Sequence, residues 1–200
     1  MKVLVACEYS GTVRDAFIKR GHDAVSCDIL PTDSPGPHYQ GDVRDILNDG
    51  WDLMIAHPPC TFMSNAGARW MYPTKGNIDQ NRLDKALEAK EFFMTFLNAD
   101  IPKICVENPN PLKIVMLPQH TQIIQPFEYG EPYSKKTLLW LKGLPKLIPT
   151  CIIPEHTTFC PSNTGGKKRG EKYSNGVAKN GHTRSKTFQG IAEAMAAQWG

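Results

Sequence analysis

Short apolar runs alternate with helix-like segments along much of this chain, and no other feature of the sequence constrains its fold as strongly. Between the first two runs, Val13, Ala16 and Phe17 recur at helical spacing, and a longer helix is predicted over 78–98. Strands that alternate with helices indicate an α/β fold with a mostly parallel sheet and helices on both faces. The runs predicted to be strands are 2–7, 24–27, 53–56 and 103–107, followed by shorter ones at 121–125 and 137–141.

Periodicity and composition divide the chain into three parts. Residues 61–77 are rich in Gly, Asn, Pro and Thr and are predicted to form a long loop. Apolar periodicity vanishes over 149–184 and returns in an amphipathic helix over 188–199. The pattern predicts a main domain over 1–149, a short, basic, loop-rich segment over 150–184, and a C-terminal helix over 185–200 that packs back on the main domain.

Polar side chains follow the predicted strands at the points where the strands end. Glu8 and Ser10 follow the first strand, Asp28 the second, Cys60 the third and Glu107 the next. Ligands of such sheets bind at the carboxyl ends of the strands. We therefore expect these side chains to surround one crevice.

The Pro58-Pro59-Cys60 turn has two interpretations. A cysteine held on a stiff backbone at a strand end can be a positioned nucleophile, provided that nearby positive charge or N–H groups raise its thiolate fraction. The alternative is a structural cysteine in a proline-rich turn. The tripeptide alone does not decide between them.

The motif Val106-Glu107-Asn108-Pro109 is equally open. A carboxyl group at the end of an apolar strand can be desolvated and kept protonated, and could then act as an acid toward a heterocycle nitrogen. The alternative is a helix N-terminal carboxylate, because Pro109 can open a helix.

The turn after the first strand argues against two common cofactor classes. It contains a single glycine, Gly11, and lacks both the dinucleotide fingerprint and the phosphate loop of nucleotide hydrolases. Asp28 lies 17 residues beyond Gly11 and could accept hydrogen bonds from ribose hydroxyls. Its alternative role is that of a turn residue at the end of a strand.

The cysteines predict no disulfide framework. Cys7, Cys27 and Cys105 lie in or beside apolar runs and are expected to be buried free thiols. A second cysteine and histidine cluster has two interpretations, a zinc site or unpaired loop residues, and its non-standard Cys-x4-His-x3-Cys spacing favours the absence of a metal. The candidate zinc ligands are Cys151, His156, Cys160 and His182.

Charge and hydropathy limit the partners. The segment 165–186 holds seven Lys or Arg residues against one acid, on a chain whose formal net charge is +3. Such a segment is either a phosphate-contacting surface or a solvated loop. No apolar run approaches the roughly 20 residues that span a bilayer, and residues 1–7 are too short for a signal peptide. We expect a cytoplasmic protein with no membrane partner.

Taken in chain order, these motifs resemble the cytosine-carbon-5 DNA methyltransferase family, especially its short members borne by phages or prophages. That family has a cofactor turn, two acids at strand ends, a Pro-Pro-Cys nucleophile loop and a Glu-Asn dipeptide. The resemblance covers most of the chain except 150–183. The positions that match are Cys7 to Arg14, Asp28, Gly41-Asp42-Val43, Pro58-Pro59-Cys60, Glu107-Asn108, Lys135 to Trp140 and Gly190 to Ala196.

The resemblance implies a Rossmann-like class I methyltransferase fold, S-adenosylmethionine as cofactor, and methyl transfer to cytosine carbon 5 through a covalent Cys60 adduct. It implies that DNA is the partner, that 150–184 recognises it, and that the protein acts alone or as a homodimer. The implied catalytic residues are Cys60, Glu107 and Asn108. The implied cofactor-binding residues are Glu8, Tyr9, Ser10, Gly11, Asp28, Asp42 and His57. The implied substrate-binding residues are Pro59, Ser64, Asn65, Arg69, Lys135, Lys136, Lys167, Lys168 and Arg169.

The chain also departs from the family pattern. His57 stands where the family has glycine, Lys135 and Lys136 replace an arginine pair, and the recognition segment is short. These departures keep two alternatives open. One is the same chemistry on RNA or on a free cytosine nucleotide, and the other is a catalytically idle nucleic-acid-binding module. The basic segment favours DNA, and the presence of both Cys60 and Glu107 disfavours the idle module.

Overall fold

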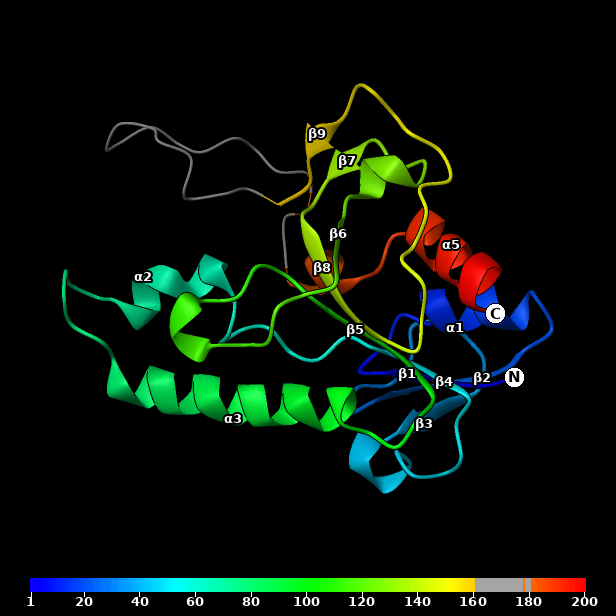
Figure 1. Cartoon of the computed structure of the whole chain (residues 1–200), viewed down its shortest axis with the longest axis horizontal. Helices are drawn as coiled ribbons and strands as arrows, with labels where there is room; N and C mark the ends of the chain where they lie inside the picture. Colours follow the sequence, from blue (N-terminus) through cyan, green and yellow to red (C-terminus); the bar gives the residue numbers. More distant parts are fainter. Residues whose placement is uncertain (161–177, 179–180) are drawn as a thin grey trace.

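A seven-stranded sheet organises the chain in this computed structural model, which describes residues 1–160, 178 and 181–200 (Figure 1). The strand order in the described part is β3-β2-β1-β4-β5-β8-β6, and its first five positions are parallel. β8 runs antiparallel to both of its neighbours. The strands are β1 (Lys2–Ala6), β2 (Asp23–Asp28), β3 (His38–Gln40), β4 (Leu53–Ala56), β5 (Lys103–Asn108), β6 (Gln122–Ile124) and β8 (Thr137–Lys142).

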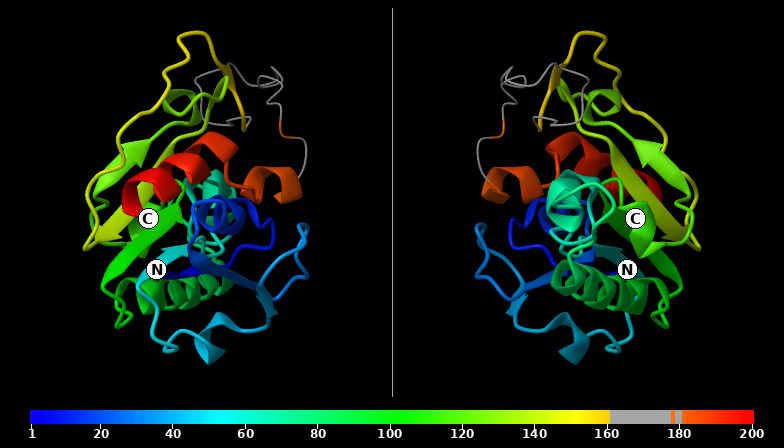
Figure 2. Two further views of the ribbon diagram at one scale, coloured as in Figure 1. Left: turned by 90° about the vertical axis from the view of Figure 1, so that its right-hand side faces the viewer. Right: turned by 90° about the vertical axis from the view of Figure 1, so that its left-hand side faces the viewer.

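Helices cover both faces of this sheet (Figure 2). Along β1, Val3 and Val5 belong to a core shared with α1 (Thr12–Ile18) and α5 (Gln189–Trp199). Leu4 and Ala6 belong to a second core, shared with α3 (Gln80–Leu97). Successive strand side chains point to opposite faces, so a strand buried on both sides is apolar throughout. The predicted Rossmann-like α/β fold with helices on both faces is confirmed, and its 3-2-1-4-5 order is that of doubly wound sheets.

Several short elements were not predicted. The loop expected over 61–77 contains a short helix, and two two-residue strands form a small separate sheet. Elements of two to four residues are too short to show periodicity. The remaining elements are α2 (Ala68–Met71), α4 (Gly181–Ser185), β7 (Tyr133–Ser134), β9 (Thr157–Thr158) and the 3-10 helices η1 (Val43–Asp45), η2 (Asn65–Gly67), η3 (Lys113–Val115) and η4 (Pro126–Glu128).

The three-part division of the chain stays a prediction, because 161–177 and 179–180 lie outside the described residues. β9, at the start of the predicted segment 150–184, pairs with β7. Within the residues that the structure covers, no helix is both long and apolar enough to cross a bilayer.

Candidate active site at the carboxyl ends of the strands

Strand register brings the predicted site residues to one edge of the sheet. Ala56 in β4 is paired with Ala6 in β1 on one side and with Val106 in β5 on the other. The next residues along these strands are Cys7, His57 and Glu107. Parallel strands end at the same edge, so three residues distant in sequence become neighbours.

His57 and Glu107 form a hydrogen-bonded pair at this edge. Nδ1 of His57 lies 3.2 Å from Oε2 of Glu107, and both side chains are largely buried. The other ring nitrogen of His57, Nε2, is buried and has no hydrogen-bond partner among the described residues. A buried polar atom without a partner is rare and calls for an explanation.

The surroundings of Glu107 bear on the two interpretations of its motif. Burial raises the pKa of its carboxyl group, but the hydrogen bond from His57 and the charge of Lys135 outweigh burial, so the pKa lies below its usual value. This direction favours the charged carboxylate over a carboxyl group kept protonated by desolvation alone.

Cys60 lies in a tight turn beside this pair. Its carbonyl oxygen accepts hydrogen bonds from the backbone N–H groups of Met63 (3.1 Å) and Ser64 (2.9 Å). Burial and the charge of Glu107 raise the pKa of the Cys60 thiol, while Lys135 acts in the opposite direction. Cys60, Glu107 and Lys135 thus act on one another electrostatically, and the unbound protein holds Cys60 mainly as a thiol.

Asn108 ties the cysteine turn to the acid. Its Nδ2 donates a hydrogen bond to the carbonyl oxygen of Pro58 (3.3 Å). Its side chain is buried, and Oδ1 has no partner within the described residues. The next stretch of the loop is fastened by backbone hydrogen bonds from Asn65 to Asn110 (2.8 Å) and from Leu112 to Met63 (2.7 Å).

The loop residues predicted to contact the substrate separate into two groups. Ser64 is buried and forms an isolated bridge with Pro111, whereas Asn65 and Arg69 are exposed. The Arg69 guanidinium lies 4.4 Å from the ring centroid of Trp70, which is itself exposed. Of these three side chains, only that of Ser64 is buried.

The turn after β1 uses Glu8 to cap α1. The Glu8 carboxylate is buried and accepts hydrogen bonds from the N–H groups of Val13 (2.7 Å) and Arg14 (3.2 Å). Gly11 has a left-handed φ of 74°, and a Cβ there would approach the Arg14 guanidinium to 2.5 Å. The Glu8 carboxylate therefore occupies the helix N-terminus, where anions commonly bind.

Arg14 is a structural residue that the sequence reasoning missed. It is fully buried, pairs with Asp15 (2.8 Å), and its guanidinium donates to several oxygens of β2 and of the loop after it. The acceptors are the hydroxyls of Ser26 and Thr32 and the carbonyl oxygens of Ser34, Pro35 and Pro37. An arginine beside Val13 and Phe17 on an apolar helix face was the signal available in the sequence.

Asp28 and Asp42, the two acids proposed to bind the cofactor, differ in how fully their carboxylate oxygens are already hydrogen-bonded. Oδ1 of Asp28 accepts a hydrogen bond from the N–H of Leu30 (2.9 Å), and this is the only bond of the Asp28 carboxylate to the described residues. Both oxygens of Asp42 are taken by Arg44, whose hydrogen bonds lower the pKa of Asp42 to about 2. Asp28 is thus the more available acceptor.

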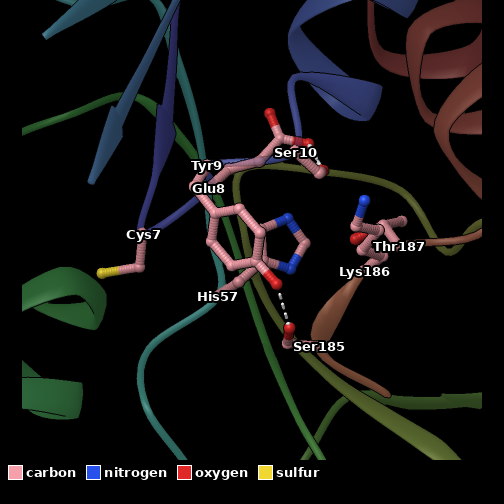
Figure 3. Close-up of a pocket in the computed structure, with 8 residues that line it drawn as sticks. All are labelled: Cys7, Glu8, Tyr9, Ser10, His57, Ser185, Lys186 and Thr187. Carbon is pink, nitrogen blue, oxygen red and sulfur yellow. Dashed lines mark hydrogen bonds between the residues drawn. The ribbon is translucent and has the colours of Figure 1, made fainter. Parts of the chain in front are cut away.

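Two small cavities meet at His57. The first, of about 50 Å³, is lined by the turn after β1 and by residues 185–187 (Figure 3). Tyr9 Oη and Ser185 Oγ lie 2.6 Å apart across it, and Lys186 pairs with Asp33 (2.7 Å) nearby. The second cavity also borders Glu107, Lys135 and Phe188. At about 50 Å³ the first cavity has room for a few waters, so a nucleoside would require residues 185–187 to move.

Two lysines predicted to contact the substrate lie in different surroundings. Lys135 Nζ donates to the carbonyl oxygen of Arg184 (2.8 Å) and borders the second cavity, whereas Lys136 is exposed. The predicted contacts Lys167, Lys168 and Arg169 lie outside the described residues.

The candidate zinc ligands do not gather in the part of the chain that is described, where no three suitable side chains come together. His156 instead stacks on Phe127, with ring centroids 4.0 Å apart. The side chain of His182 lies outside the described residues.

The fold of this chain is similar to that of known solved structures. No family model matches the chain, and no curated protein matches it. Among solved structures, a prophage-encoded E. coli protein with the provisional name DNA modification methyltransferase has a TM-score of 0.46 and 16% sequence identity, over 77% of this chain. The matched region covers 52% of that protein, so the chain corresponds to about half of its length.

Proposed function

We propose that this chain is a DNA cytosine-5 methyltransferase that uses S-adenosylmethionine and forms a covalent adduct through Cys60. One observation carries the proposal. A cysteine and a carboxylate, from motifs with the order and spacing that this chemistry needs, lie at adjacent strand ends and are joined through Asn108 and Pro58.

The residues at the ends of β1, β2 and β4 fit the cofactor. Asp28 has a carboxylate oxygen available for ribose hydroxyls, and His57 and the turn after β1 line one cavity. When bound, S-adenosylmethionine supplies a methyl group on a sulfonium, which is an electrophile. Glu8 serves this site by holding the turn on α1, because its carboxylate is already used. Tyr9, Ser10 and Gly11 form the turn that contacts the cofactor, and Asp42 contributes less to cofactor binding.

The chain's own residues would then perform covalent catalysis. The Cys60 thiolate adds to carbon 6 of cytosine, and protonation of ring nitrogen 3 lets carbon 5 accept the methyl group. Loss of the carbon-5 proton and cleavage of the bond between Cys60 and carbon 6 restore the ring and the thiolate. Lys135 favours the thiolate, since its charge opposes the burial that raises the pKa of Cys60. A cytosine within a duplex would first have to be flipped out of the stack.

A trapping experiment tests this function. Duplex DNA containing 5-fluorocytosine should form a covalent adduct with the wild-type protein and S-adenosylmethionine, because fluorine cannot leave as a cation. Peptide mapping should place the adduct on Cys60. Cys60→Ser should form none, and Cys151→Ser, which changes an exposed thiol, should behave as wild type.

The same assay separates the alternative substrates. Single strands, RNA and free cytosine nucleotides are tested in parallel, with labelled cofactor as a second readout. Adduct formation through another cysteine, or full activity in Cys60→Ser, contradicts the proposal. Glu107→Gln should slow adduct formation by roughly 10²-fold, the usual scale for a positioned proton donor.

A further inference from the structure

The orphaned nitrogen of His57 has no structural explanation in the fold. A buried histidine that serves only packing or orientation generally satisfies both ring nitrogens. Here Nδ1 contacts Glu107, while Nε2 is buried without a partner in the described chain, and the His57 residue borders both cavities. His57 also replaces the glycine that precedes Pro-Pro-Cys in the family that the chain resembles.

The surroundings of His57 contain few charges. Glu107 at the end of β5 is its direct partner, and Lys135 lies beyond Glu107 across the second cavity. Cys7, Glu8 and Tyr9 line the first cavity on the side of β1, and Lys186 lines it on the side of α4. The Glu8 carboxylate is turned toward α1. Cys60 follows three residues later in the chain. Glu107 is thus the anion positioned to share a proton with the ring.

We propose that His57 and Glu107 act as one proton-sharing pair, in which His57 supplies the proton that Glu107 delivers to ring nitrogen 3 of the cytosine. His57 is a positioning and proton-supplying residue, since it acts through Glu107. This inference rests on the proposed function. It explains how Glu107, whose pKa lies below its usual value, takes part in acid catalysis.

The proton balance of this step is simple. The His57 imidazolium gives its Nδ1 proton to the Glu107 carboxylate, and His57 becomes neutral. Glu107 passes one proton to ring nitrogen 3. The electron pair that forms the bond from Cys60 to carbon 6 comes from the thiolate sulfur. When Cys60 leaves, ring nitrogen 3 returns its proton through Glu107 and His57 is recharged. The pair neither gains nor loses a proton over the cycle.

The proposal predicts a particular pH dependence. The active form needs Cys60 ionised and the His57–Glu107 pair protonated, so kcat should rise and then fall with increasing pH. The limb that the pair contributes should be lost in His57→Gln. His57→Gln can still donate a hydrogen bond to Glu107 but cannot supply a proton, so it should lose about 10²-fold in kcat at neutral pH. Its KM for DNA should stay within about threefold of wild type, because no proposed contact to DNA is removed.

A second variant tests the source of the proton. His57→Gly restores the residue of the resembling family and opens space, so added imidazole should restore activity in proportion to the imidazolium concentration. His22→Gln is the control, since His22 lies between α1 and β2, at the opposite edge of the sheet. If His57→Gly keeps kcat within threefold of wild type without imidazole, or if neutral imidazole is the rescuing species, the proposal is wrong.

A measurement without turnover keeps the test independent of activity. Histidine NMR of the wild-type protein and of Glu107→Gln should show changed ring chemical shifts of His57 when the carboxylate that contacts its Nδ1 is replaced. Unchanged ring shifts overturn the pair. Wild-type protein that methylates no substrate and forms no adduct contradicts the proposed function itself. If the wild-type protein is active and the His57 variants are equally active, only the inference about His57 is contradicted.

Discussion

Nδ2 of Asn108 donates a hydrogen bond to the carbonyl oxygen of Pro58, 3.3 Å away, and so connects the strand that ends in Glu107 to the turn that carries Cys60. Asn108 and Pro58 are 50 positions apart in the sequence. Their bond fixes the proposed nucleophile, Cys60, relative to Glu107, the proposed proton donor to the cytosine ring. The relative position of reacting groups affects the reaction rate more than it affects substrate binding.

Removing this connection should lower both rate and stability. We expect Asn108→Ala to cost about 1–3 kcal/mol in the free energy of unfolding, the scale for a buried carbonyl left without its donor. Adduct formation with 5-fluorocytosine should slow while cofactor affinity stays close to wild type. Urea unfolding and quenched-flow trapping measure the two effects. Exposed Asn98→Ala, after α3, is the control; equal adduct rates in all three proteins would argue against the connection.

The two acids of the proposed cofactor site should respond differently to substitution. Asp28→Ala should weaken S-adenosylmethionine binding tenfold or more, because a hydrogen bond to a charged group is worth about 1.5–3 kcal/mol. Asp42→Ala should have a smaller effect, since Arg44 already occupies its carboxylate. Isothermal titration calorimetry distinguishes them, and equal affinities in wild type and Asp28→Ala would reject the role of Asp28.

Asp42 should contribute to stability only above a definite pH. The pKa of Asp42 in the folded protein is about 2, below the roughly 3.9 of an aspartate in an unfolded chain. The contribution of Asp42 to the free energy of unfolding is therefore complete above pH 4 and is lost as the pH falls toward 2. The pair is partly exposed, which limits its worth to about 0–1 kcal/mol. Asp42→Asn should therefore be slightly less stable than wild type at pH 6, and the two should converge near pH 2 in urea unfolding. A difference that grows on acidification would contradict this sign.

Arg14 should be essential to the fold near the cofactor site. Arg14→Lys keeps the charge but loses the planar fork that reaches several loop oxygens. We expect a loss of about 3 kcal/mol in unfolding free energy, the scale for breaking a buried charged network. The control Arg44→Lys changes an exposed guanidinium and should stay within about 0.5 kcal/mol. Thermal unfolding measures both, and similar losses would mean that the buried network contributes little.

The basic segment should contribute to DNA affinity through phosphates. Neutralising Lys167, Lys168 and Arg169 should reduce the slope of log affinity against log salt by up to about three, since each phosphate contact contributes about 0.9. The matched control neutralises Lys19, Arg20 and Lys103, which lie near the amino-terminal ends of the strands. Fluorescence anisotropy over a salt series gives the slopes. Equal slopes in wild type and the first variant would make the segment a solvated loop.

The sequence by itself determined the fold class and the set of residues at the sheet edge. Apolar runs of β1, β4 and β5 can be buried only as interior strands, and residues that end parallel strands must share an edge. Short elements such as β7 and β9 escaped prediction, because two residues carry no periodicity and their pairing depends on distant chain.

Only the tertiary structure decided how the edge residues act on one another. The sequence placed Glu107 at the end of an apolar strand and left open whether its carboxyl group is protonated, whereas the register of β4 and β5 brings His57 to that carboxyl group, whose pKa lies below its usual value. In the same way, Glu8 is used by α1 and Asp42 by Arg44, while Asp28 keeps an available oxygen. Desolvation follows from local hydrophobicity, which a sequence displays. Charge state and hydrogen-bond partners depend on neighbours tens of residues away, and these are set only when the strands pair.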